Sequence, residues 1–441
     1  MPSAAFTTLG CKVNQYETQR ILDSFEEAGF RIVPFEAEAD VYVINTCSVT
    51  SVAESKSRYM IRRASRANPA AKVVVTGCAA QMAINKQESL DGADVVVPNP
   101  QKLETLTHFF RAYPEMERWI HEEPRAELKR QVATRTRATL KIQDGCSVHC
   151  SYCSIPFTRP GLTSRPSDEV LNEAQRMVEM GFREIVLTGV LIGAYGPESG
   201  SGGPNFVELL DMLCEIPGLE RLRISSIEMR QVTPDLIERI GTSKIVPHLH
   251  IPLQSGDSGV LADMNRPYTQ EDYLGLCARL YRYVPDISIT ADVMVGFPTE
   301  TVQRFESSLH VCREARYLKA HVFRFSPRFG TPADQWGDPV PDSEKQRRSL
   351  AVSQISRQTG EAHAKGFEGR TLRVLAETRH AETGIWKGLS DNYIEVRFAG
   401  PATSLNQLLW VRVDEVKDGV GFGEIVSPPT PSRMELKVAR A

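Results

Sequence analysis

The sequence predicts an α/β protein in three parts: an N-terminal doubly wound parallel sheet, a central partial barrel of six β/α units, and a small C-terminal β-barrel. Two observations carry this prediction. Short apolar runs alternate with helical patterns as far as residue 365, as in parallel sheets whose faces are covered by helices. From residue 366 onward, strands alternate with turns and no helical pattern intervenes. A chain of 441 residues also has room for about three domains of ~150 residues.

Composition and charge exclude several classes of protein. Apolar residues make up 41% and charged residues 24% of the chain, so we expect neither a disordered nor a fibrous protein. The sequence has no apolar run of about 18 residues and no signal-peptide pattern at its start, so we expect no membrane span and a cytoplasmic location. The net charge of −3 excludes a uniformly basic surface but leaves room for a local basic face.

The N-terminal domain is predicted over residues 1–125. Four apolar runs, with helical patterns between the first three, indicate short buried strands that alternate with helices. These runs end at Cys11, Cys47, Cys78 and Pro98. The carboxyl ends of parallel strands meet at one edge of a sheet, so the three cysteines are predicted to converge there. Three thiolates without a fourth protein ligand favour an iron–sulfur cluster with one open iron, and ordinary burial of small apolar cysteines is the alternative.

The central domain is predicted over residues 132–365, after a charged linker at residues 111–137. Six strand candidates with helical patterns between them are too few for a closed eight-stranded barrel, so they predict a partial barrel with its site at the carboxyl ends of the strands. The candidate strands are residues 138–142, 184–187, 222–226, 248–253, 287–295 and 321–325. A polar helix at residues 342–365 is predicted to connect this domain to the next.

Cys146, Cys150 and Cys153 form a CxxxCxxC group shortly after the first of these strands. Nine cysteines in a reducing compartment indicate metal binding or catalysis rather than disulfides. Three thiolates on one loop can hold three irons of a four-iron cluster and leave the fourth iron free to bind a small molecule. Zinc is the alternative, with His149 as a fourth ligand, although structural zinc sites usually show paired CxxC spacing.

The CxxxCxxC group, with Tyr152 before its last cysteine and a β/α series around it, resembles the radical S-adenosylmethionine (SAM) superfamily. The resemblance implies that the open iron binds SAM, which one electron cleaves to a 5′-deoxyadenosyl radical. It also implies that residues at the ends of later strands contact SAM, and the capping of helices and turns is their alternative role. The implied SAM contacts are Tyr152, Gly189, Ser226, Glu228, Gln254 and Asp292.

The whole layout resembles the radical SAM methylthiotransferase family over nearly the full chain. Thr8-Leu-Gly-Cys-Lys-Val-Asn14, Asn45-Thr-Cys47 and Thr76-Gly-Cys78 are similar to the N-terminal motifs of this family, and the first of them is similar to its MtaB branch. That branch adds a methylthio group at C2 of N6-threonylcarbamoyladenosine beside the tRNA anticodon. The resemblance implies two [4Fe-4S] clusters, SAM, a tRNA substrate and a low-potential electron donor such as flavodoxin or ferredoxin.

Three other functions stay open. One branch of the same family acts on isopentenyladenosine in tRNA, and another modifies an aspartate of a ribosomal protein. The third alternative is an RNA-binding protein whose clusters are structural or sense redox state. The polar residues at the strand ends of the central domain argue against this last function.

Residues 366–430 are predicted to form the small β-barrel, which by resemblance is a TRAM-like RNA-binding module. Its candidate strands are residues 371–376, 393–398 and 408–413. Between Gly366 and Ser427 it has seven Lys or Arg and nine Asp or Glu, so its role as the main RNA-binding surface is in doubt.

A basic helix in the N-terminal domain is the predicted compensation. Residues 55–87 contain no Asp or Glu, and Arg58, Arg62 and Arg66 recur at helical spacing along one face. We expect this face to contact RNA phosphates, with a merely solvated helix face as the alternative. Nothing in the sequence predicts the oligomeric state.

Overall fold

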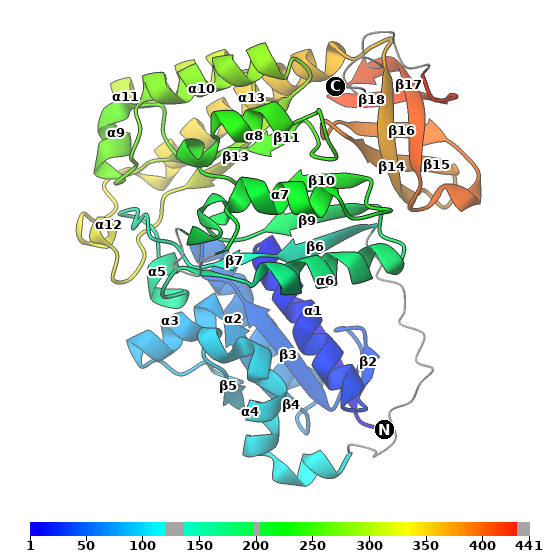
Figure 1. Cartoon of the computed structure of the whole chain (residues 1–441). Helices are drawn as coiled ribbons and strands as arrows, with labels where there is room; N and C mark the ends of the chain where they lie inside the picture. The colour runs from blue at the N-terminus through cyan, green and yellow to red at the C-terminus, as the bar shows by residue number, and fades with distance from the viewer. Residues whose placement is uncertain (120–135, 198–202, 430–441) are drawn as a thin grey trace.

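The computed structural model describes residues 1–119, 136–197 and 203–429 and confirms the predicted fold class (Figure 1). The predicted domain limits at residues 125, 132 and 430 lie outside the described residues, as do residues 120–135 of the predicted linker. Figure 1 shows the N-terminal domain in blue and cyan, the central domain in green and yellow, and the small barrel in orange and red. Within the described part of the chain, none of the helices combines the length and apolar character that crossing a membrane requires.

The N-terminal domain is a five-stranded parallel sheet with helices on both faces. The strand order is β2-β1-β3-β4-β5. The strands are β1 (Ser3–Thr8), β2 (Arg31–Val33), β3 (Val41–Thr46), β4 (Lys72–Gly77) and β5 (Val95–Val96). One face is covered by α1 (Lys12–Glu27) and α4 (Thr105–Ala112), and the other by α2 (Ser51–Ala67) and α3 (Cys78–Lys86). Two short 3-10 helices flank α4, η1 (Asn99–Glu104) and η2 (Pro114–Trp119).

Strand β3 shows why helices cover this sheet on both faces. Val41 and Val43 belong to the core beneath α1 and α4, whereas Tyr42 and Ile44 belong to the core beneath α2 and α3. All four side chains are fully buried, which explains the unbroken apolar run in the sequence. The edge strand β2 was not predicted, because it has only three residues and begins with an exposed arginine.

The central domain is a partial barrel of six parallel strands, as predicted. They are β6 (Arg137–Lys141), β9 (Glu184–Thr188), β10 (Arg221–Ile224), β11 (His248–His250), β12 (Ser288–Val295) and β13 (Lys319–Arg324). They form two sheets, β6-β9-β10 and β11-β12-β13. Two single parallel bridges, Leu222 to Ile245 and Ser226 to His250, join the sheets into one curved series. A short hairpin of β7 (Gln143–Asp144) and β8 (Thr163–Ser164) lies beside the first strand.

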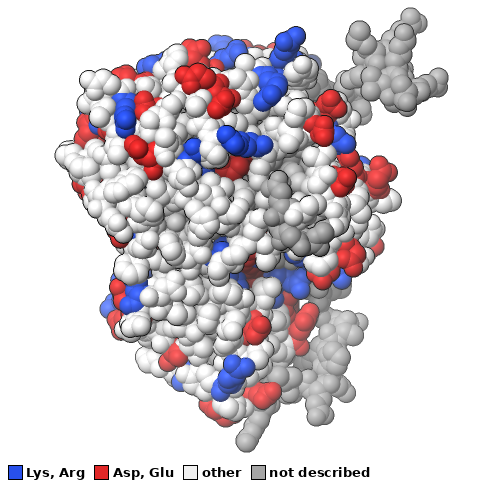
Figure 2. All heavy atoms as spheres, turned by 60° about the vertical axis from the view of Figure 1, so that its left-hand side comes forward, with Lys and Arg blue, Asp and Glu red and all other residues white. Residues whose placement is uncertain are grey.

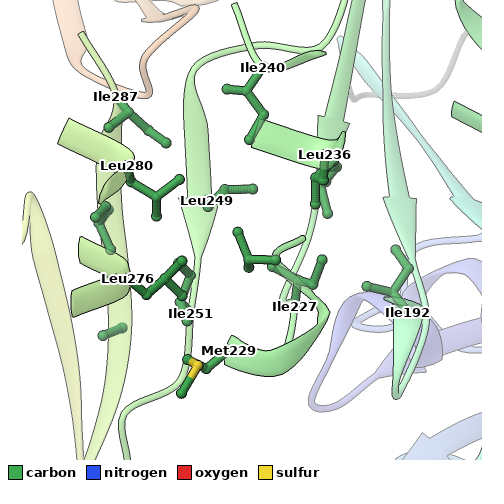
Figure 3. Packing of buried hydrophobic residues seen from close by; sticks show 14 of the residues in the cluster. Ile192, Ile227, Met229, Leu236, Ile240, Leu249, Ile251, Leu276, Leu280 and Ile287 are labelled. Atoms are coloured by element: carbon green, nitrogen blue, oxygen red, sulfur yellow. The ribbon is translucent and has the colours of Figure 1, made fainter. Parts of the chain in front are cut away.

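Helices on the outside of the strands bury the largest hydrophobic core of the protein. They are α6 (Ser167–Glu179), α7 (Phe206–Cys214), α8 (Pro234–Arg239), α9 (Ser258–Asp263), α10 (Gln270–Tyr283), α11 (Val302–Glu314) and α13 (Asp342–Lys365). Leu249 and Ile251 of the β11 segment both belong to this core, and Figure 3 shows Ile251 beside Leu276 of α10. Because side chains alternate along a strand, His248 and His250 lie on the opposite face, inside the barrel.

The C-terminal domain is a closed barrel with the strand order β14-β15-β16-β18-β17. Its strands are β14 (Thr371–Arg379), β15 (Ile385–Ser390), β16 (Glu395–Ala399), β17 (Leu408–Lys417) and β18 (Val420–Ile425). Three of these strands were predicted, and β15 and β18 were not. Gly388 explains part of the failure: a Cβ there would lie 2.2 Å from the backbone oxygen of Leu375, so close strand packing selects a residue that usually indicates a turn.

The small barrel docks on the amino ends of the central strands through buried ion pairs. Arg221, fully buried at the start of β10, lies 2.8 Å from the carboxylate of Asp391. Arg223 lies 2.7 Å from Glu184 and donates hydrogen bonds to the backbone oxygens of Ser390 and Asp391. Tyr393 stacks on His248, with ring centroids 4.2 Å apart. The small barrel therefore lies at the opposite ends of these strands from the CxxxCxxC loop.

Candidate active site

The three N-terminal cysteines, which we call the front site, follow three neighbouring parallel strands. Cys11 follows β1, Cys47 follows β3, and Cys78 follows β4. The strand order reverses between β1 and β3, and the crevice at such a reversal is the usual ligand site of an open parallel sheet. The Cys47 thiol interacts electrostatically with the thiols of Cys11 and Cys78, and burial raises its pKa to about 11. The structure thus places the three thiols within electrostatic range of one another, and their binding of one cluster stays a prediction.

Two residues of the first sequence motif hold the front-site loops together. Gly10 has a φ of +92°, and a Cβ at this position would lie 2.6 Å from the sulfur of Cys47, so only glycine fits. The side-chain amide of Asn14 donates to the backbone oxygens of Leu9 and Thr46, both at 2.9 Å. The buried Asn14 thus ties the loop before Cys11 to the loop before Cys47.

The CxxxCxxC cysteines, which we call the barrel site, lie on a loop that begins just after β7. Gly145 starts this loop with a φ of +75°, and a Cβ there would overlap the backbone oxygen of Gly161. The sulfur of Cys146 accepts a hydrogen bond from the Val148 amide at 3.4 Å. Burial raises the pKa of Cys153 to about 12, and the nearby thiols of Cys150 and Cys146 contribute to the shift.

The donor sets of both sites fit iron–sulfur clusters. All nine cysteines are free thiols, and each site gathers three of them. Within the described residues, no three His, Cys, Asp or Glu side chains lie close enough together to hold a single metal ion. Three thiolates at each site match the donor set of a four-iron cluster with one open iron. His149, the ligand that zinc would need, is exposed and has a φ of +51°.

The predicted SAM contacts line the carboxyl ends of the central strands. Gly189 follows β9, and a Cβ there would meet the side chain of Gln143 at 3.0 Å. Gln254 has a φ of +66°, and its backbone N–H donates a hydrogen bond to the backbone oxygen of Asp292 at 2.8 Å. Ser226 bridges to His250 at the seam between the two sheets. Their contact with SAM stays a prediction.

The side chains of Glu228 and Tyr152, two of the predicted SAM contacts, contact other parts of the protein. The carboxylate of Glu228 pairs with Arg266, whose guanidinium also donates to the sulfur of Cys150 at 3.3 Å. Tyr152 packs against Phe297, with ring centroids 6.5 Å apart, in a small apolar core. Tyr152 therefore has a packing role in addition to its predicted contact with SAM.

Sequence reasoning missed two residues that organise the barrel site. Gln143 accepts hydrogen bonds from the amides of Val190 and Leu191 and donates to the backbone oxygens of Asp144 and Gly145, so it joins the Gly189 segment to the cysteine loop. Arg266 joins that loop to the carboxylate that follows β10. Neither residue lies in a recognisable motif. Each forms hydrogen bonds with at least one residue distant in sequence.

A group of polar side chains lies inside the barrel. His250 approaches the carboxylate of Asp292 at 3.3 Å, and the rings of His250 and His321 are 5.8 Å apart. Burial lowers the pKa of His248 and of His321, and the positive charge of Lys12 contributes to both shifts. Lys12, which follows Cys11 directly, is therefore within electrostatic range of the barrel interior.

The predicted basic face lies on α2, and its three arginines differ. Arg58 forms ion pairs with Glu54 at 3.5 Å and Glu88 at 2.8 Å, two acids just outside the acid-free stretch. Arg62 and Arg66 are exposed, and no carboxylate of the described residues pairs with them. Of the three arginines on the predicted face, Arg62 and Arg66 therefore carry a charge that no carboxylate of the described residues pairs with.

The partial barrel with its CxxxCxxC loop defines a radical SAM enzyme, and a model of the Radical SAM superfamily matches residues 140–312. Residues 3–98 match a model described as "Uncharacterized protein family UPF0004". The threonylcarbamoyladenosine tRNA methylthiotransferase MtaB of Bacillus subtilis (strain 168) is 39% identical over 440 residues, 96% of each chain. The chain belongs to the radical SAM methylthiotransferase family, in its MtaB-like branch.

Other relatives support the same family. The MtaB protein of Thermotoga maritima is 33% identical over 91% of this chain and 92% of its own. The tRNA-2-methylthio-N(6)-dimethylallyladenosine synthase of Methylobacillus flagellatus is also 33% identical, over 95% and 98%. Membership confirms the predicted enzyme class and cofactors, two [4Fe-4S] clusters and SAM, and excludes the non-catalytic alternative.

Proposed function

We propose that this protein inserts a methylthio group at C2 of N6-threonylcarbamoyladenosine next to the tRNA anticodon, with the front site and the barrel site each holding one cluster. The observation that carries the proposal is a link between the segments that hold the two sites. The side-chain amide of Asn99 lies 4.0 Å from the sulfur of Cys78 and donates to the backbone oxygen of Thr158 at 2.6 Å. Thr158 ends α5 (Ile155–Thr158), which begins shortly after Cys153. A substrate between the domains would therefore face both sites.

This pairing of sites fits the reaction. The C2–H bond of adenine has no acidity that a side-chain base could use, so the bound clusters and SAM must supply the radical chemistry and the sulfur. The chain supplies position: Asn14 and Gly10 set the front-site loops, and Gln143 and Arg266 set the barrel-site loop.

Lys12 supports the choice of nucleoside. The threonylcarbamoyl group carries a carboxylate, whereas the dimethylallyl group of the alternative substrate is an apolar hydrocarbon. Lys12 is exposed beside Cys11, and no carboxylate of the described residues pairs with it. An unpaired ammonium at the mouth of the site matches an anionic substituent and gives an apolar one nothing to bind.

Nucleoside analysis tests the proposed function. The protein with reconstituted clusters, SAM and a reductant is incubated with tRNA carrying N6-threonylcarbamoyladenosine and, separately, with tRNA carrying N6-dimethylallyladenosine. We expect the 2-methylthio derivative only from the first tRNA. Product from the second tRNA alone would overturn the choice of substrate.

Replacing Lys12 by glutamine is expected to lower kcat/KM for the threonylcarbamoyl substrate about tenfold, because a charge-assisted hydrogen bond is lost. The measurement is product formation against tRNA concentration. Lys365→Gln, at an exposed lysine that ends α13, is the matched control. If Lys12→Gln weakened binding equally to tRNA with and without the threonylcarbamoyl group, Lys12 would not recognise the carboxylate.

We also propose that RNA phosphates contact Arg62 and Arg66. Basic and acidic side chains are interspersed on the face shown in Figure 2, and no wholly basic surface is seen on it. Phosphate contacts on such a surface depend on individual cations. The acidic small barrel lies away from the cysteine sites, at the amino ends of the central strands. The exposed end of α2 belongs instead to the domain that carries the front site.

Replacing Arg62 and Arg66 by alanine is expected to flatten the dependence of log tRNA affinity on log salt concentration by about 0.7–0.9 for each lost contact. Arg58→Ala should have a smaller effect, because its charge is already paired. Arg313→Ala, at an exposed residue of α11, is the control. An unchanged slope in the double variant would place the tRNA on another surface.

Two further proposals concern the surroundings of the enzyme. We place it in the cytoplasm, because its tRNA substrate is there and its nine cysteines are free thiols. We also propose a low-potential protein such as flavodoxin or ferredoxin as electron donor, because reductive cleavage of SAM requires one electron.

A further inference from the structure

A buried group of five charged side chains, the Glu17 ion network, joins the N-terminal and central domains. The carboxylate of Glu17, on α1, contacts Lys102 and Lys141 at 2.6 Å each and Arg159 at 2.8 Å. Asp144 adds contacts to Arg159 at 2.8 Å and to Lys141 at 2.6 Å. The side chains of Glu17 and Arg159 are each only 2% exposed.

The network lies between the two cysteine sites. Arg159 directly follows α5, on the barrel-site side, and its guanidinium donates to the side-chain oxygen of Asn14 at 2.8 Å. Asn14 is the residue that ties the front-site loops together. Arg159 also interacts electrostatically with the thiols of Cys47 and Cys78. Arg159 therefore contacts Asn14, which holds the front-site loops, and its positive charge acts on the thiols of Cys47 and Cys78.

The network has a net charge of +1, because three cations face two carboxylates. Burial disfavours the charged form of Arg159, but the carboxylate of Glu17 outweighs it and raises the arginine pKa well above its usual value. Burial likewise opposes ionisation of Glu17, and Lys102 and Arg159 hold its pKa well below the usual range. Arg159 and Glu17 therefore keep their charges, whereas burial lowers the pKa of Lys102 despite its contact with Glu17.

Stability alone does not explain such a network. Desolvation of buried ion pairs offsets most of their attraction, and apolar residues of similar volume would hold two domains together at least as well. Unlike apolar residues, charged side chains produce an electrostatic field, and this field is strong where water is excluded. The front site lies within the range of this field, and its three thiolates and iron–sulfur cluster would carry negative charge.

We infer that the Glu17 ion network sets the reduction potential of the front cluster through Arg159, whose positive charge favours the more negative, reduced state and stabilises an anionic sulfur species bound there. The inference rests on the proposed function only in placing a cluster on Cys11, Cys47 and Cys78. Its measurement contains no tRNA, so an error in the assigned nucleoside would leave the result unchanged.

The test uses two substitutions that change the network charge in opposite directions. The full chain carries Cys146→Ala, Cys150→Ala and Cys153→Ala, so that only the front cluster forms, and its potential is titrated by electron paramagnetic resonance. Arg159→Met, which makes the network neutral, should lower the potential. Glu17→Gln, which removes the carboxylate that faces Arg159, should raise the potential. A tenfold change in the ratio of reduced to oxidised cluster corresponds to 59 mV, and we expect about this shift in each direction.

Opposite signs separate an electrostatic role from a structural one, because loosening the domain interface would move both variants the same way. Arg159→Lys, which keeps the charge, should stay near the parent value. Arg223→Met removes an equally buried arginine at the small-barrel interface and should leave the potential unchanged. Shifts of the same sign, or no shift in either variant, would overturn the inference. If Arg159→Met fails to hold a cluster, Glu17→Gln decides alone: an unchanged or lowered potential contradicts the inference.

Discussion

Replacement of Cys146, Cys150 and Cys153 by alanine is expected to remove about half of the iron and to abolish SAM cleavage. With two four-iron clusters, roughly eight irons per chain should fall to about four. The front site should keep its cluster, because its ligands come from a separate domain with its own two hydrophobic cores. Iron analysis and the yield of 5′-deoxyadenosine from SAM and a reductant measure both effects.

A fourth cysteine provides the control for this triple variant. Cys214, on α7, is half-buried and lies 4.0 Å from the hydroxyl of Ser243, away from both sites. Cys214→Ser should keep the full iron content and the full yield of 5′-deoxyadenosine. Continued SAM cleavage in the triple variant would refute the assignment of the barrel site.

Replacement of Cys78 by alanine is expected to separate the two halves of the reaction. The front site would lose its third thiolate, and methylthio product should disappear. The barrel-site loop keeps the hydrogen bonds from Val148 and Arg266, so SAM should still be cleaved. The measurements are methylthio nucleoside and 5′-deoxyadenosine from the same reaction mixture.

The fold should tolerate this change. Cys78 begins α3, is buried, and touches Asn99 only weakly, so alanine fits without a clash. Unfolding temperature, measured without clusters, checks this. Methylthio product at the wild-type level would show that Cys78 is no ligand of the sulfur-carrying cluster.

Most of the fold was predictable because hydrophobic periodicity is a local signal. The fully buried run of β3 and the six central strands each show in a few consecutive residues. The strands that were missed lack this signal. β18 contains Gly421 and Gly423, and a Cβ at Gly423 would lie 1.8 Å from the backbone oxygen of Arg412, so close strand contact rather than a turn selects glycine.

The candidate site was predictable only where chemistry is concentrated in short motifs. The front cysteines follow the ends of three parallel strands, which the topology brings together, and the barrel cysteines lie on one short loop. The residues that organise the sites could not be predicted, because they act across long separations in sequence. Arg159 meets Glu17 from 142 positions away, and Arg266 meets Cys150 from 116. Neighbouring residues give no indication of such pairs.

The attachment of the small barrel has a consequence for substrate length. Buried contacts from Arg221, Arg223 and His248 fix this domain to the amino ends of the central strands, while the reactive cysteines lie at the carboxyl ends. β9 spans five residues, or about 17 Å at ~3.3 Å per residue. An RNA that contacts both ends must bridge at least this span. A free nucleoside cannot span this distance, so an enzyme that needs contacts at both ends would not accept it, even when the base is correct.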